Sequence, residues 1–255
     1  MHNLKLTIEY DGSNYHGWQK QKNASTIQET IENALAVMTR EQIRVIGSGR
    51  TDAGVHALGQ TANFRCSTEI PPKAFVAGLN SLLPDDIVIH SCQSVDLRFH
   101  SQYDARAKTY QYRILNRAVP AAICRQYAWF IPKELDVRAM QQACRHLIGT
   151  QDFKSFEASG SPRSHTVRTV TTARVYRDAT DHIFFEITAN GFLRFMVRNI
   201  VGTLAEAGTG KIDPDDFKRI LNAENRDHAG ATAPPHGLFL MRAIYDDAVA
   251  VPLSR

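Results

Sequence analysis

The sequence of 255 residues contains no apolar run approaching the ~18 residues that a membrane-spanning helix needs. Its first residues, Met1 to Lys5, form no hydrophobic segment of the kind found in signal peptides, so we expect the protein not to be secreted. Low-complexity segments and glycine- or serine-rich linkers are also absent. With 43% hydrophobic and 22% charged residues, the composition is typical of a globular protein, and we expect it to be cytoplasmic.

Residue patterns that hold metals or nucleotides are missing as well. The four cysteines stand far apart, which argues against a zinc site and against a disulfide framework. Neither a His-Glu-x-x-His segment nor a Gly-Lys-Ser/Thr phosphate loop occurs. Ser48 lies in Gly47-Ser48-Gly49, which is not the Gly-x-Ser-x-Gly turn of a hydrolase. We therefore predict no metal and no organic cofactor.

Positive charge is present in mild excess, with a net charge of +4 and an isoelectric point near 8.9. Basic residues dominated by arginine gather in three stretches, which are Arg98 to Arg113, Arg163 to Arg177 and Arg194 to Arg198. The planar guanidinium of arginine suits phosphate groups, and Tyr103, Tyr110 and Tyr112 between the charges could stack on unpaired bases. These stretches favour RNA as a partner, although they could also be solvated faces of the protein.

Hydrophobic periodicity predicts a β-α-β-β-α-β order in the first part of the chain. The predicted elements are a strand over residues 4–10, a helix that begins with a capping box of Thr26 and Glu29, strands over 43–46 and 61–65, a helix opened by Pro71-Pro72 and a strand from residue 87.

The same order recurs with a strand over residues 108–115, a helix capped by Asp136 and ended by Gly149, strands over 169–176 and 183–188, a helix over 192–207 and a strand over 238–245. A short extra helix begins at Asp213-Pro214, and residues 117–132 and 151–168 are predicted surface loops. We expect an α+β protein of two ferredoxin-like halves, residues 1–105 and 106–255. Their strands would form one mostly antiparallel sheet with helices on one face and a central active-site cleft.

The most informative segment is Gly47 to His56, which frames Asp52 and Arg50 with three glycines. Glycine permits tight loops and close approach of other groups, so this segment predicts a loop that presents a carboxylate and a cation. A carboxylate can act as nucleophile or general base without a cofactor. The alternative is structural, because Asp52 could cap a turn or pair with Arg50. We expect His56 mainly to stabilise the loop.

The segment Gly49 to Ala57 resembles the signature of the tRNA pseudouridine synthase A family. Other matching pieces follow in order, namely Glu9 to Gly12, Tyr15 to Gln19, Lys108 to Tyr112, Met196 to Gly202 and Gly237 to Leu240. The resemblance spans roughly residues 4–245 and implies the same two-half fold. It also implies an isomerase that detaches uracil from C1′ of uridine, turns the base and reattaches it through C5.

The resemblance implies a role for each of five residues. Asp52 is the catalytic residue, acting as nucleophile or base. Tyr110 stacks on the uracil, and Arg198 keeps Asp52 ionised in a desolvated pocket. Arg50 helps hold the flipped nucleotide out of its stack, and Leu240 forms an apolar floor.

From the residues alone, alternatives also stay open for Tyr110, Leu240 and Arg198. Tyr110 and Leu240 could be ordinary core residues of strands, and Arg198 could contact phosphate together with Arg194 one turn away. For the whole protein, the resemblance implies a homodimer that modifies positions 38, 39 and 40 in the anticodon stem-loop of tRNA. The alternatives are a pseudouridine synthase that acts on another RNA and an RNA-binding protein without activity.

Overall fold

The computed structural model describes residues 1–158, 160 and 165–246. The strands that precede residue 116 are β1 (His2–Tyr10), β2 (Ile46–Gly47), β3 (His56–Cys66), β4 (Ile87–Val95) and β5 (Ala107–Leu115). The later strands are β6 (Trp129–Phe130), β7 (Gly149–Asp152), β8 (Val167–Arg177), β9 (His182–Ala189) and β10 (Leu238–Ile244). The α-helices are α1 (Ile27–Thr39), α2 (Pro72–Leu82), α3 (Val137–Arg145), α4 (Met196–Gly208) and α5 (Pro214–Asn222).

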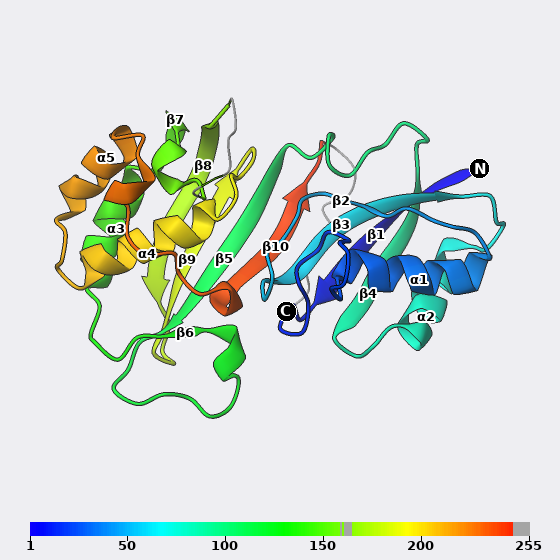
Figure 1. Cartoon of the computed structure of the whole chain (residues 1–255), viewed down its shortest axis with the longest axis horizontal. Coiled ribbons are helices and arrows are strands. Elements are labelled where there is room, and N and C mark those ends of the chain that lie inside the picture. Colours follow the sequence, from blue (N-terminus) through cyan, green and yellow to red (C-terminus); the bar gives the residue numbers. More distant parts are fainter. Residues whose placement is uncertain (159, 161–164, 247–255) are drawn as a thin grey trace.

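All these strands join one sheet in the order β4-β1-β3-β10-β5-β9-β8-β7, with β2 paired to β3 and β6 paired to β5 (Figure 1). The pairing is mostly antiparallel, as the sequence predicts. The parallel contact of β10 with β3 covers only two residue pairs, Phe239 with His56 and Leu240 with Ala57. The last strand, β10, therefore lies in the middle of the sheet. It joins the strands β4, β1 and β3 on one side to β5, β9, β8 and β7 on the other.

Strand order on each side of this contact follows one rule. The later part of the chain contributes β5, β8, β9 and β10, in that chain order. In the sheet, the last of these strands, β10, lies beside the first, β5, and β9 and then β8 follow. In the earlier part of the chain, β4, β1 and β3 follow that order and the short β2 pairs with β3. The repeated order agrees with the predicted β-α-β-β-α-β pattern. The boundary between residues 105 and 106 stays a prediction.

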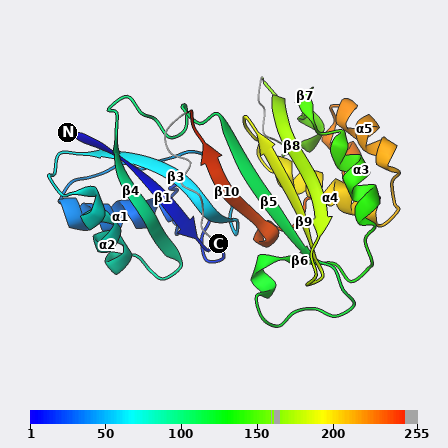
Figure 2. The ribbon, with the colours of Figure 1, turned by 180° about the vertical axis from the view of Figure 1, so that it is seen from behind.

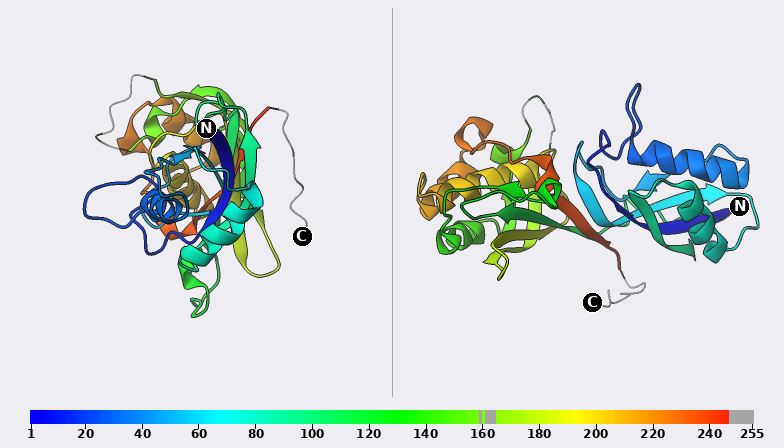
Figure 3. Two further views of the ribbon diagram at one scale, coloured as in Figure 1. Left: turned by 90° about the vertical axis from the view of Figure 1, so that its right-hand side faces the viewer. Right: turned by 90° about the horizontal axis from the view of Figure 1, so that it is seen from below.

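The helices cover one side of the sheet. Helices α1 and α4 lie in front of the strands in Figure 1, and the view from behind in Figure 2 shows the strands nearer the viewer. The view from below in Figure 3 places both helices on the same side of the sheet. The alternation of side chains along β1 accounts for this arrangement, because every second residue points to the same face of the sheet. Leu4, Leu6 and Ile8 lie on that face and are buried together with Ile27 and Ile31 of α1.

Two predicted helices differ from the observed ones at their ends. Helix α4 begins at Met196, not at residue 192, because Phe195 takes a left-handed backbone conformation with φ of 62°. Residues 192–195 therefore form a loop that leads into the helix. Asp136 caps α3 as predicted, accepting hydrogen bonds from the N–H groups of Arg138 and Ala139. That helix ends at Arg145, before the predicted stop at Gly149.

The prediction of a surface loop over residues 151–168 is wrong in part. Phe153 and Phe156 are fully buried, and the ring of Phe156 stacks on Phe217 of α5 at 5.4 Å between centroids. This segment thus ties α5 to the core. Arg163, which we placed among the basic residues, lies outside the described residues.

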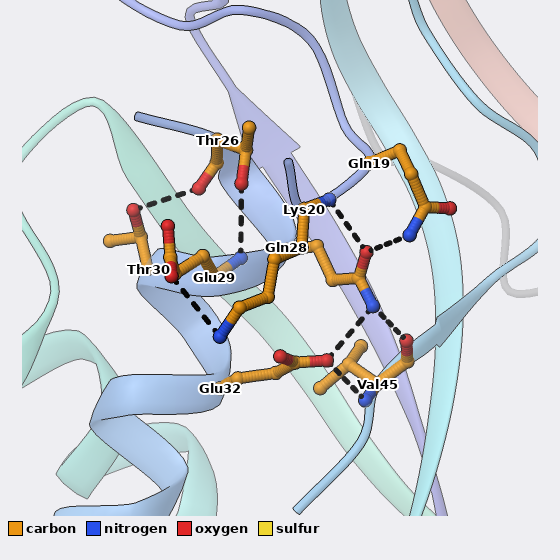
Figure 4. A network of polar contacts seen from close by, with 8 residues as sticks. All are labelled: Gln19, Lys20, Thr26, Gln28, Glu29, Thr30, Glu32 and Val45. Atoms are coloured by element: carbon orange, nitrogen blue, oxygen red, sulfur yellow. Dashed lines mark hydrogen bonds and ion pairs between the residues drawn. The ribbon is translucent and has the colours of Figure 1, made fainter. Parts of the chain in front are cut away.

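A polar network at the start of α1 fixes the loop that precedes it (Figure 4). The buried Gln28 side chain accepts hydrogen bonds from Nε2 of Gln19 and the N–H of Lys20. Its own Nε2 donates to Glu32 and to the carbonyl of Val45. All hydrogen-bonding positions of this buried amide are satisfied, which is the condition for burying it without a large loss of stability.

Candidate active site

Asp52 lies on the loop between β2 and β3, and backbone contacts on both sides hold this loop. The carbonyl of Thr51 accepts a hydrogen bond from the N–H of Trp18 at 3.1 Å, and the carbonyl of Asp52 accepts one from Val55 at 3.1 Å. Gly17 passes directly beneath the loop with φ of 88°, and a β-carbon on it would lie 2.5 Å from the carbonyl oxygen of Thr51. Only glycine fits this crossing.

Side chains beneath the loop hold it as well. The Tyr10 hydroxyl shares a buried 2.8 Å hydrogen bond with Oγ1 of Thr51. Gln60 of β3 donates to the carbonyl of Gly49 at 2.9 Å and accepts from the hydroxyl of Ser48 at 2.7 Å. The loop that carries Asp52 is thus fixed to β1 and β3, which is the support a reactive side chain requires.

Arg198 reaches Asp52 from helix α4, which lies on the other side of the pairing between β3 and β10. Its Nη1 lies 3.6 Å from Oδ2 of Asp52. The Arg198 side chain is 12% exposed and that of Asp52 is 30% exposed, so the pair is reachable from solvent at the carboxylate. Nε of Arg198 donates to the carbonyl of Ala233 at 2.7 Å, which fixes the guanidinium in this orientation. The two residues that the family resemblance pairs thus lie in contact, and their roles in a reaction stay a prediction.

Burial raises the pKa of Asp52 above the ordinary range, and the charges of Arg198 and Arg194 lower it by less. The charge of Arg198 therefore favours the ionised carboxylate, but desolvation is the larger effect. A carboxylate with a raised pKa is a stronger base and is more readily protonated than a solvated one. Such perturbation is typical of functional sites.

Tyr110 of β5 is buried beside this pair. Its ring packs edge-on against Phe192 at 4.9 Å between centroids. Burial raises the pKa of the Tyr110 hydroxyl, and Asp52 is near enough for its negative charge to raise it further. Leu240 of β10 lies directly opposite Tyr110 in the sheet and is fully buried. The structure therefore places Tyr110 near Asp52 and Leu240 beside Tyr110 on the neighbouring strand, and the roles of both stay predictions.

Arg50 lies two residues before Asp52 on the same loop, and its side chain is exposed. Among the described residues the ion-pair partner of Asp52 is Arg198, so Arg50 does not form the ion pair with Asp52 that was one of the two structural alternatives. An exposed arginine at the rim of the site is free to approach a ligand from outside.

His56 follows the loop and is buried beneath it. Its Nδ1 accepts a hydrogen bond from the N–H of Gly12 at 3.0 Å and also lies 3.0 Å from Oδ1 of Asp11. Its Nε2 lies 3.1 Å from the carbonyl of His236, and its ring stacks on Phe239 at 4.7 Å between centroids. These contacts join the loop to β10, in agreement with the expected stabilising role.

Two residues near the site were not assigned a role from the sequence. The ring of Phe195 lies near two cations, with the guanidinium carbons of Arg194 and Arg198 each 4.8 Å from its centroid. Lys108 packs against Gly49, at the start of the Asp52 loop. The sequence could have indicated that Lys108 lies near the site, because Lys108 comes two residues before Tyr110 on a strand and residues i and i+2 share one face of a sheet.

Within the described residues, no group of three or more histidine, cysteine, aspartate or glutamate side chains is arranged to hold a metal ion. In the same part of the chain, no helix is both long enough and apolar enough to cross a membrane.

A known protein family matches two long segments of the chain. The family model described as tRNA pseudouridine synthase matches residues 6–104 and 143–246. The matched residues include Arg50, Asp52, Arg198 and Leu240, whereas Tyr110 and Lys108 lie between the two matched segments.

Curated relatives match nearly the full length. The chain is 49% identical over 246 residues to tRNA pseudouridine synthase A of Acetivibrio thermocellus, covering 96% of this chain and 100% of that one. It is 47% identical to tRNA pseudouridine synthase A of Clostridium acetobutylicum, with the same coverage. A solved archaeal box H/ACA sRNP Nop10-Cbf5 complex is 10% identical, with a TM-score of 0.36 over 94% of this chain and 49% of that one, too distant to bear on function. The family match and the full-length relatives together establish that this chain belongs to the tRNA pseudouridine synthase family.

Proposed function

We propose that this protein is a tRNA pseudouridine synthase that isomerises uridine to pseudouridine at positions 38, 39 and 40 of the anticodon stem-loop. The observation that carries the proposal is the contact between Asp52 and Arg198, which joins the two sides of the sheet at a partly exposed carboxylate. Family membership supports the reaction, and the sequence resemblance supports the positions in tRNA.

The reaction breaks the bond between C1′ and N1 of uridine and forms a bond between C1′ and C5. The proton on C5 is lost and N1 gains one, so atoms and electrons balance without any external group. Asp52 would act on the ribose or the base, either as nucleophile or as general base. Arg198 would hold the carboxylate in place and favour its charged form as the bound RNA excludes water.

The uracil must leave its stack to reach a carboxylate inside the protein. We propose that Tyr110 receives the flipped base on its ring and that Leu240 provides the apolar surface beneath it. Arg50, exposed at the rim, would then occupy space beside the extruded nucleotide. In this scheme residues 1–105 supply Asp52 and Arg50, and residues 106–255 supply the tyrosine and Arg198.

We further propose that the protein acts as a homodimer, without metal or organic cofactor, in the cytoplasm, where mature tRNA is found. A homodimer would allow a second copy to contact other parts of the same tRNA.

The experiment uses purified protein, a chelator and a prefolded anticodon stem-loop with uridine at positions 38 to 40. Formation of pseudouridine at those positions, read by chemical mapping, supports the reaction, the positions in tRNA and the independence from metal and cofactor. Product at other uridines only would contradict the positions, and product only on another RNA would contradict the substrate. Tight binding without product would indicate an RNA-binding protein instead. Product only after a metal or nucleotide is added would contradict the cofactor-free reaction.

A further inference from the structure

Lys108 occupies an unusual position for a lysine. It lies on β5 two residues before Tyr110, so its side chain emerges on the face of the sheet that carries the site. Its neighbours across the sheet are both small, Ala189 on β9 and Ala243 on β10. The side chain is half-buried, lying along the protein rather than extending into solvent.

The end of this side chain lies against the Asp52 loop at Gly49. A β-carbon built on Gly49 would be 3.0 Å from Cε of Lys108 and 3.7 Å from its Nζ. The absence of a side chain at Gly49 therefore leaves the space that the ammonium group occupies. One residue further along the loop is the exposed Arg50, and two residues beyond that is Asp52.

This ammonium group has no anionic partner within the described part of the protein. Lys20, Lys154 and Lys211 each contact a glutamate at between 2.6 and 3.1 Å. None of the ion pairs or side-chain hydrogen bonds among the described residues includes the Lys108 amine. Burial accordingly lowers the pKa of Lys108. A cation held partly out of water without a counterion is unfavourable unless a ligand supplies the negative charge.

We propose that Lys108 binds a backbone phosphate of the nucleotide chain that carries the target uridine. The inference rests on the proposed function and adds a contact to it. Phosphate is the anion that an extruded nucleotide brings with it, and a lysine ammonium recognises it as a point charge. Lys108 and Arg50 then present two cations, one beneath the loop and one at its rim, on the approach to Asp52.

The test compares Lys108→Met with Lys5→Met as the matched control. Lys5 is also half-buried, and burial lowers its pKa too. Its ammonium lies 5.8 Å from the ring centroid of Phe99, and it alternates on β1 with the buried Leu4 and Leu6, so it faces away from the helices. We expect Lys108→Met to raise KM about tenfold with a smaller effect on kcat, whereas Lys5→Met should leave both unchanged.

A phosphate-specific readout separates binding from a purely structural effect. Anticodon stem-loops are made with a single neutral methylphosphonate at each linkage near the target. One such linkage should raise KM of the wild-type protein and have no further effect on Lys108→Met, which would show that the lysine and that phosphate form one interaction. Equal sensitivity of both proteins at every linkage would overturn the proposal.

Two further variants keep the proposal testable if Lys108→Met is unstable. Lys108→Arg keeps the charge and should retain most of the phosphate sensitivity. Gly49→Ala should displace the ammonium without removing it, raising KM while the melting temperature stays near that of the wild type. If the wild type makes pseudouridine and all three variants match Lys5→Met, only the Lys108 assignment is wrong. If the wild type makes none, the proposed function itself is wrong.

Discussion

Oδ2 of Asp52 and Nη1 of Arg198 lie 3.6 Å apart, although the first belongs to the loop before β3 and the second to helix α4. The carbonyl of Ala233 holds Arg198, and the backbone of Trp18 holds the Asp52 loop, so neither partner depends on the other for its position. A preorganised pair of this kind stabilises charge in a reaction without first having to rearrange.

Replacing Asp52 with asparagine should abolish pseudouridine formation while tRNA affinity changes by less than a few-fold. The amide keeps the shape of the side chain but can act neither as nucleophile nor as base. Single-turnover conversion and filter binding measure the two quantities separately. Full activity in Asp52→Asn would show that another group performs the reaction.

The same variant should be more stable than the wild type at neutral pH. Because burial raises the pKa of Asp52 in the folded state, the folded protein binds a proton there more readily than the unfolded chain. The charged carboxylate therefore destabilises the fold above its raised pKa, and this penalty disappears as the pH falls below the ordinary aspartate value of about 3.9. Melting curves of both proteins over this range should converge at acid pH; a constant difference would contradict the raised pKa.

The acid limb of the activity profile should shift to higher pH in Arg198→Met. Activity requires the ionised carboxylate and falls as the pH drops through the pKa of Asp52. Arg198 lowers that pKa, so its removal allows burial to raise the pKa further. Arg194→Met is the control and should give a smaller shift, since Arg194 has the weaker effect. Single-turnover rates from about pH 4 to about pH 8 provide the comparison, and identical acid limbs in all three proteins would argue against the assignment.

Tyr110→Phe should bind RNA almost normally, because the ring that packs on Phe192 is kept. Its turnover should fall only if the hydroxyl moves a proton. Tyr110→Ala should also weaken binding, by about 1–3 kcal/mol for the lost stacking. Dissociation constants and single-turnover rates for both variants test this. Wild-type behaviour in both would leave Tyr110 with a purely structural role.

Affinity for tRNA should fall steeply as salt rises, because backbone phosphates meet clustered cations. The slope of log affinity against log salt should be about −0.7 to −0.9 for each phosphate contacted. Some arginines of the predicted clusters are already engaged within the protein: Arg174 pairs with Glu186, and Arg113 lies over the ring of Phe239. Titrations at several salt concentrations measure the slope, and a flat response would exclude a large contact with the RNA backbone.

Gly17→Ala should reduce both stability and activity, because a β-carbon there would collide with the carbonyl of Thr51 beneath Asp52. Gly210→Ala is a matched control, since Gly210 also has a positive φ, of 73°, but nothing lies within 4 Å of its β-carbon position. We expect the control to lose about 1 kcal/mol from backbone strain alone and to keep its activity. Equal losses in both variants would mean that the crossing beneath Asp52 is unimportant.

Local patterns predicted most elements of the fold. Alternation identified β1, and Thr26 caps α1 as expected, accepting from the N–H of Glu29. The other half of the predicted capping box is wrong, because the Glu29 carboxylate pairs with Lys20 and not with the N–H of Thr26. The late start of α4 depends on the left-handed backbone of Phe195, which no periodicity encodes.

Long-range placement was harder to predict. No local feature indicates that β10 pairs with β3 as well as β5, or that residues 153 and 156 are buried against α5. Proximity of Asp52 to Arg198 was available only through the family resemblance, because contacts between distant segments leave no trace in residue spacing. The position of Lys108 against Gly49 was not predicted at all, since it depends on how the loop lies over β5.

The central place of β10 also has a consequence for folding. The edges of β3 and β5 that it pairs with lie far from it in sequence, and the hydrogen bond between His56 and His236 spans 180 positions. Before β10 docks, both strands expose unpaired backbone groups along these edges, which other chains can pair with. Closing so long a loop is slow compared with forming the local helices. The strand that carries Leu240 of the candidate site is therefore also the one whose pairing removes these exposed edges and with them a risk of aggregation.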